Sequence, residues 1–171
     1  MKPAQCLLIF CLFFCCWSQL DAFEGRRWSR SAVNRYAQEV WAQKHWTQID
    51  EGFEDSAGNE IISVSFKCCE TLDLSEARHL LVNELDKIFT MIRNSQSKAI
   101  SKTNGPFALE NISFALVFRS DVTKSDGSPV ISLASYSNGS LHYFTKGPHG
   151  RKKIHEETVE EALKILKPKG S

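Results

Sequence analysis

The sequence predicts one small α+β domain built on a four-stranded sheet. Three patterns lead to this prediction: apolar and polar residues alternate over residues 61–69 and 111–119, an amphipathic stretch starts at residue 73, and an Asn-Gly pair at 138–139 separates two short apolar runs. The predicted order of elements is α-β-α-β-β-β-α. This order fits a largely antiparallel four-stranded sheet with helices packed on one face.

The first part of the domain is predicted to be a helix followed by a loop. No Gly or Pro interrupts residues 28–46, and Ser29 or Ser31 can cap a helix there. One side of this helix carries apolar residues, Val33, Ala37, Val40 and Trp41. Residues 50–59 are acidic and contain two glycines, so they predict a loop before the body of the domain.

The body begins with the strand at 61–69, whose alternate residues face the core. Asp73 and Glu76 predict a capping box at the start of the next helix. The apolar residues of that helix recur every three or four positions: Leu74, Ala77, Leu81, Leu85, Ile88 and Ile92. A polar connector, residues 94–105, leads to the second strand.

The next three predicted strands are expected to form an antiparallel meander. The strand at 111–119 turns through residues 121–129 into a third strand at 130–136. Asn138-Gly139 supplies the positive φ angles of a type I′ turn into the fourth strand, residues 141–145.

A loop rich in Gly, Pro and basic residues, 146–153, precedes the predicted last helix. This helix ends before Pro168, and Glu156 and Glu157 are expected in its first turn, where the helix dipole favours negative charge. Its apolar face carries Val159, Ala162, Leu163 and Leu166.

The N-terminus predicts a signal peptide, residues 1–18. Lys2 precedes an apolar run at 6–17, which is shorter than the roughly 20 residues that a membrane-spanning helix needs. Cleavage after Ser18 is favoured, with a site at Ala22 as the alternative.

Lipidation of Cys15 or Cys16 is a further alternative, although bulky residues precede both. The mature chain is expected to be exported, either periplasmic or secreted, and to touch a membrane only if it is lipidated or uncleaved. Residues 19–60 then hold the N-terminal helix and acidic loop, and residues 61–171 hold the α+β body of the same compact domain.

The charge balance argues against a nucleic-acid partner. The chain has 21 basic and 20 acidic residues, and removal of the signal peptide takes away Lys2 alone, so 20 of each sign remain. A protein that neutralises many phosphates needs a basic excess.

Only two of the six cysteines, Cys68 and Cys69, remain after removal of the signal peptide. Adjacent thiols suggest a redox role, a vicinal disulfide or a soft metal. Strand alternation favours a structural interpretation instead, with Cys68 in the core and Cys69 outside it. We predict no metal site and no cofactor.

No catalytic motif is complete. His155-Glu156 resembles the start of the zinc-protease motif HExxH, but Val159 stands where the second histidine is needed. Nucleophile-elbow, phosphate-loop and dinucleotide motifs are missing from the sequence. The other histidines fall on different predicted elements: His45, His79, His142 and His149.

Aromatic and basic residues gather at the N-terminal helix and form the candidate binding set: Trp28, Arg30, Arg35, Trp41 and Trp46. Such side chains are typical of a protein-binding or anionic membrane-binding surface. The alternative is that the tryptophans dock this helix on the domain.

The runs VSFKCCETLDLSEARHLLVNELDKIF, NISFALVF, NGSLHYFTK and HEETVEEALKIL resemble a family of small exported bacterial proteins of uncharacterised function. The resemblance covers about residues 62–166 and implies a bacterial envelope or secreted location. It transfers no catalytic residue.

We therefore expect an exported, non-enzymatic binding or interaction module. Its protein partner would bind the N-terminal helix, an exposed sheet edge or the uncovered sheet face. The alternative is an envelope hydrolase or small-ligand enzyme whose histidine and carboxylate groups meet only in the folded chain.

Overall fold

The structure is a computed structural model, and it describes most of the chain: residues 29–56, 59–98, 107–120 and 128–167. It begins with a helix at residues 29–44, called the N-terminal helix below. The other elements follow in order: β1 (Thr47–Ser56), β2 (Asn59–Lys67), α2 (Leu74–Lys98), the 3-10 helix η1 (Leu109–Asn111), β3 (Ile112–Val117), β4 (Ile131–Ser137), β5 (Ser140–Gly147), β6 (Gly150–Thr158) and α3 (Val159–Leu166). The predicted signal peptide, its cleavage sites and Trp28 lie outside the described residues.

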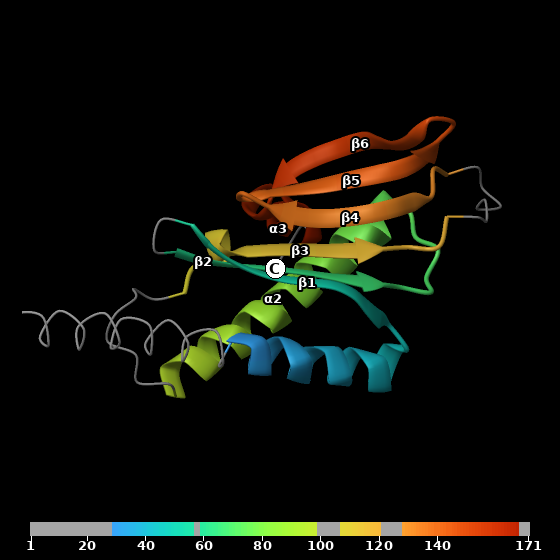
Figure 1. The fold of residues 1–171 in the computed structure, drawn as a ribbon. Coiled ribbons are helices and arrows are strands. Elements are labelled where there is room, and N and C mark those ends of the chain that lie inside the picture. The colour runs from blue at the N-terminus through green and yellow to red at the C-terminus, as the bar shows by residue number, and fades with distance from the viewer. Residues whose placement is uncertain (1–28, 57–58, 99–106, 121–127, 168–171) are drawn as a thin grey trace, which may run out of the picture.

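The strands form one six-stranded sheet in the order of the sequence, from β1 to β6 (Figure 1). Strands β2 and β3 are parallel, and the other neighbours in the described sheet are antiparallel. The parallel pair arises because α2 connects β2 to β3 and returns the chain to the same end of the sheet. The predicted four-stranded sheet is therefore wrong: the sheet has six strands and is mixed, although the α+β class is consistent with the structure.

The first strand that the prediction missed is β1, which covers most of the acidic segment predicted as a loop. Its register with β2 sets Phe53 opposite Ile62 and Gly52 opposite Ser63. An edge strand has a hydrogen-bonded neighbour on one side only, so polar and acidic residues do not prevent its formation.

The second missed strand is β6, which replaces the predicted basic loop and the start of the predicted last helix. Gly147 and Gly150 pair across a two-residue turn, and Gly150 has a φ of 120°, which favours glycine. Glu156 and Glu157 belong to this strand. The prediction that they lie in the first turn of the last helix is wrong, because α3 starts only at Val159.

The predicted capping box of α2 is confirmed. The backbone N–H of Glu76 donates to Oδ1 of Asp73 at 3.0 Å, and the backbone N–H of Asp73 donates to Oε2 of Glu76 at 2.9 Å. The helix then runs to Lys98, several residues beyond the predicted start of the connector.

One hydrophobic core joins the helices to one face of the sheet. Tyr36 of the N-terminal helix meets Phe66 of β2 and Phe114 of β3 edge-on, with ring centroids 5.4 and 6.2 Å apart. Buried residues of α2 and Ala162 of α3 belong to the same core. The opposite face of the sheet carries small polar side chains that belong to no core cluster: Ser63, Ser65, Ser113, Ser135 and Ser137.

Candidate functional site

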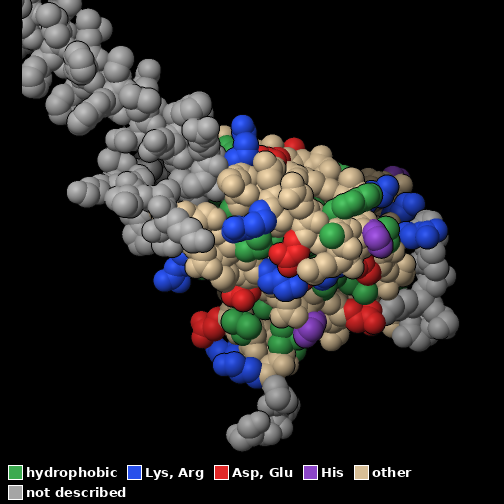
Figure 2. All heavy atoms as spheres, turned by 90° about the horizontal axis from the view of Figure 1, so that it is seen from below, with side chains coloured by type: hydrophobic (Ala, Val, Ile, Leu, Met, Phe, Trp, Pro, Cys, Tyr) green, Lys and Arg blue, Asp and Glu red, His purple; other side chains and the backbone are tan. Residues whose placement is uncertain are grey.

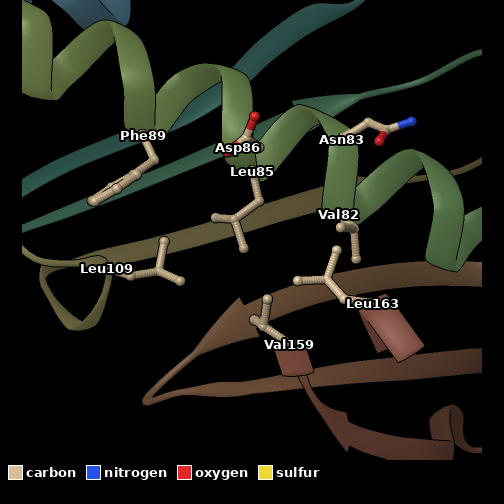
Figure 3. Close-up of a pocket in the computed structure, with 8 residues that line it drawn as sticks. All are labelled: Val82, Asn83, Leu85, Asp86, Phe89, Leu109, Val159 and Leu163. Carbon is tan, nitrogen blue, oxygen red and sulfur yellow. The ribbon is translucent and has the colours of Figure 1, made fainter. Parts of the chain in front are cut away.

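A groove between α2, η1 and α3 encloses about 440 Å³. Figure 3 shows side chains from all three elements pointing into a common space, with α2 on one side and α3 on the other. The lining is mainly apolar: Val82, Leu85, Phe89, Leu109, Val159 and Leu163, with Asn83 and Asp86. This volume lies within the range of small-molecule sites in proteins, about 300–1,000 Å³.

The sequence of α2 explains one wall of the groove. Leu81, Ile88 and Ile92 face the sheet and are fully buried. Val82 and Phe89 lie one position further along the chain, so they continue the apolar surface around the helix toward α3. The helix is therefore apolar over a wide arc, of which the sheet covers only a part.

The other walls are held by local hydrogen bonds. Thr158 caps α3, because its hydroxyl accepts the backbone N–H of Glu161 at 3.2 Å, and Val159 and Leu163 follow one helical turn apart. On the η1 side, Oδ1 of Asn111 accepts the backbone N–H of Ala108 at 3.0 Å, which fixes the turn that carries Leu109.

The two polar lining residues stand at the rim of the groove. In Figure 3, the carboxylate of Asp86 and the amide of Asn83 point away from the space between the apolar side chains. The backbone N–H and C=O groups of the helices are hydrogen-bonded within the helices. The walls therefore offer a ligand apolar contact area but few hydrogen-bond partners. The arrangement suits an apolar group.

The predicted binding residues of the N-terminal helix have different environments. Trp46 is only 1% exposed, and its indole Nε1 donates to Oε1 of Glu70 at 2.8 Å. Trp41 is 58% exposed, whereas the sequence placed it on the apolar side of the helix. Trp46 lies two residues beyond the helix and anchors the chain before β1, whereas Trp41 of the helix stays at the surface beside His45.

The two described arginines of this set contact the domain itself. Nε of Arg30 lies 3.3 Å from a carboxylate oxygen of Glu51, and its guanidinium lies 4.9 Å from the ring centroid of Phe53. Arg35 donates to the hydroxyl of Ser95 at 3.3 Å. The four described members of the predicted set, Arg30, Arg35, Trp41 and Trp46, do not share one pocket.

Cys68 and Cys69 are both free thiols, one buried and one exposed. The predicted strand at 61–69 ends earlier, at Lys67, so the two cysteines follow β2 and do not belong to it. Cys68 is buried. Burial is the main cause that raises the pKa of its thiol, and the negative charge of Glu70 raises this pKa further. A thiol that stays protonated is a poor nucleophile, so any reactivity of the pair belongs to the exposed Cys69.

Two histidines approach carboxylates on opposite faces of the outer strands. On the helix side, Nε2 of His155 lies 3.4 Å from Oε2 of Glu157, beside Tyr143 and Arg78. The hydroxyl of Tyr143, Nε2 of His155 and Oε2 of Glu157 are buried and have no hydrogen-bond partner among the described residues, so solvent does not reach them.

On the uncovered face, Nδ1 of His142 lies 3.6 Å from Oε2 of Glu156, and Ser135 is the neighbour of His142 on β4. This row has the order of a nucleophile, a base and an acid. The backbone N–H groups of these inner strands belong to the sheet ladder, so they provide no oxyanion hole.

Sequence reasoning missed a buried carboxylate, Glu84 of α2, which is hidden under the N-terminal helix. It accepts hydrogen bonds from Tyr36, Lys44 and Lys87 at 2.8, 2.8 and 2.9 Å. Its position three residues after Leu81 places it on the apolar stripe of the helix, which is a sequence signal for a buried ion pair.

Comparison of the chain with protein-family models, with curated proteins and with solved structures gives no match. The resemblance to exported bacterial proteins therefore stays a prediction. Among the helices in the described ranges, none has the length and apolar character to cross a bilayer. Within those same ranges, no three His, Cys, Asp or Glu side chains are arranged to hold a metal ion.

Proposed function

We propose that this protein is a non-enzymatic binding module that holds an apolar small molecule, or the apolar part of one, in the groove between α2, η1 and α3. The observation that supports the proposal is the convergence of six apolar side chains around about 440 Å³ that is open to solvent. Burying an apolar ligand there removes both its surface and the groove surface from water, which is favourable by about 25 cal/mol per Å².

The size of the groove favours a small molecule over a protein partner. Helix α3 has eight residues and is about 12 Å long at 1.5 Å per residue, so a bound helix would contact it for about two turns. Specific protein interfaces bury about 800 Å² on each partner. On the face seen in Figure 2, exposed hydrophobic side chains form small groups separated by charged and polar ones.

The alternative of an enzyme with dispersed histidine and carboxylate groups has less support. The pairs His155–Glu157 and His142–Glu156 lie on different faces of the sheet, and neither group lines the groove. Binding without chemistry needs only the apolar walls.

Export remains part of the proposal. Mass spectrometry of the protein purified after expression of the full chain tests it, and we expect the first residue of the purified protein to be residue 19.

The test of binding uses the neutral fluorescent probe N-phenyl-1-naphthylamine. We expect saturable binding of one probe per chain, with a rise in fluorescence as the probe leaves water. In NMR spectra, the methyl signals of Leu85, Leu109 and Leu163 should shift in proportion to occupancy, because these side chains line the groove.

Two variants and a matched control locate the site. Leu163→Ser removes a lining side chain and should weaken probe binding about tenfold, and Val159→Phe should fill the groove and abolish binding. Ile165→Ser, two residues further along α3, changes a side chain that is 58% exposed and outside the groove, so it should bind as the wild type does. Equal binding by all folded variants would contradict the proposal.

A further inference from the structure

The two edge strands of the sheet carry opposite charges. Strand β1 contains four acidic residues and no basic one. The first half of β6 contains Arg151, Lys152 and Lys153 and no acidic residue. We propose that copies of this chain associate head to tail, with the β6 edge of one copy paired with the β1 edge of the next.

The charges on both edges are available to a partner. Asp50 and Glu54 of β1 are exposed, as are Arg151 and Lys152 of β6. Among the described residues, none of these four takes part in an ion pair, whereas Lys153 contacts Glu156. Each edge thus presents unbalanced charge of one sign.

Charge selects how two copies can pair. Two β1 edges repel each other, and two β6 edges do the same, so a two-fold symmetric dimer through either edge is disfavoured. A β6 edge and a β1 edge attract each other. The contact is then heterologous, and each copy keeps one free edge for the next copy.

The strand directions allow this contact to continue the sheet. Strands β1 and β6 point the same way, because the sheet contains four antiparallel pairs and one parallel pair. A second copy that keeps its helices on the same side of the sheet therefore brings β1 beside β6 as a parallel strand. Within the described residues, β1 pairs only with β2 and β6 pairs only with β5.

A bulge interrupts each edge strand. The bulges place Ile49 of β1 and Ile154 of β6 at the surface, both exposed. In β6 the bulge separates the basic segment Gly150–Lys153 from His155–Thr158, which carries Glu156 and Glu157, so the basic segment is the part that we pair with the acidic segment Asp50–Ser56 of β1. The exposed isoleucines add apolar area that a neighbouring copy can bury.

The first test is sedimentation velocity on the protein purified after expression of the full chain. The average sedimentation coefficient should rise with protein concentration in 10 mM salt. In 300 mM salt the association constant should fall at least about tenfold, because the screening length drops from about 30 Å to well below 10 Å. A monomer at millimolar concentration in low salt would overturn the proposal.

A charge exchange gives the sharper test. The double variant Asp50→Lys/Glu54→Lys removes the net negative charge of β1, because the two lysines balance Glu51 and Asp55, and Arg151→Glu/Lys152→Glu makes β6 acidic like β1. Each variant alone should associate more weakly than the wild type. An equimolar mixture brings the basic β6 edge of the first variant to the acidic β1 edge of the second, so it should associate more strongly than either variant alone. If both variants melt as folded proteins and their mixture stays monomeric, the proposal is wrong.

The groove variant Leu163→Ser separates this contact from ligand binding, because its side chain lies on α3 and not on an edge strand. It should associate as the wild type does. Loss of association in this variant would place the contact at the groove instead of the sheet edges.

Discussion

Nε of Arg78 on α2 donates a 2.7 Å hydrogen bond to Oε1 of Glu157 on β6, across 79 residues of sequence. Both side chains are buried. The guanidinium also lies 6.0 Å from the ring centroid of Tyr143. Burial, and then the charge of Glu157, raises the pKa of Tyr143, so the phenol stays neutral beside the ion pair. This pair ties the start of α2 to an outer strand that has one neighbour in the sheet.

The variant Arg78→Met should lower the free energy of unfolding by about 3–5 kcal/mol, because it leaves the carboxylate of Glu157 buried without its cation. Urea denaturation measures this change. The double variant Arg78→Met/Glu157→Leu should recover much of the loss. Lys164→Met is the matched control, since the Lys164–Glu160 pair is exposed on α3 and should contribute less than about 1 kcal/mol. A loss below 1 kcal/mol in Arg78→Met would contradict this role.

Glu84 should make stability depend on pH in the acidic range. Burial opposes its ionisation, but hydrogen bonds from Lys44, Lys87 and Tyr36 outweigh burial and lower its pKa below the ordinary value of 4.5. A carboxyl whose folded pKa is lowered stabilises the folded state above its unfolded pKa. That contribution is lost as the pH falls from about 4.5 through the lower folded value.

Urea denaturation of the wild type and of Glu84→Gln between pH 6 and pH 2.5 tests this dependence. The variant should be less stable at pH 6, and the difference should shrink as the pH falls. Glu39→Gln, an exposed change on the N-terminal helix, is the control and should follow the wild type. A difference that stays constant over this pH range would show that the carboxylate charge does not stabilise the fold.

The sequence was sufficient for elements whose pattern depends on neighbours along the chain. The capping box of Asp73 and Glu76 formed as predicted, and so did the turn at Asn138-Gly139, with φ angles of 51° and 82°. The strands β2 to β5 alternate between a buried and an uncovered face, which local pattern reveals.

The edge strands and the groove depend on contacts that the local pattern does not show. Strand β1 is acidic and the first half of β6 is basic, and charged segments of this kind are also typical of loops. Only the pairing with a neighbouring strand distinguishes such an edge strand from a loop. The groove requires η1 and α3 to meet the side of α2 that carries Val82 and Phe89. The wide apolar arc of α2 was a readable signal that this helix contacts more than the sheet.

The tryptophans of the N-terminal region should separate into a structural and a surface residue. Trp46→Ala should lower the free energy of unfolding by about 3–5 kcal/mol, because it opens a cavity in the core and removes the hydrogen bond to Glu70. Trp41→Ala should change stability by no more than about 0.5 kcal/mol, since its side chain is mostly exposed. Equal losses for both variants would mean that Trp41 packs against the domain.

The two adjacent cysteines should react at different rates in the native protein. Cys69 is exposed, so it should react at once with a disulfide reagent such as dithionitrobenzoate, whereas Cys68 is buried with a raised pKa and should react only after unfolding. In the protein that begins at residue 19, which keeps two of the six cysteines, we therefore expect one reactive thiol per chain in native buffer and two in urea. Cys69→Ser should abolish the native reaction, and Cys68→Ala should leave it intact. A native reaction that needs both residues would support a paired redox role instead.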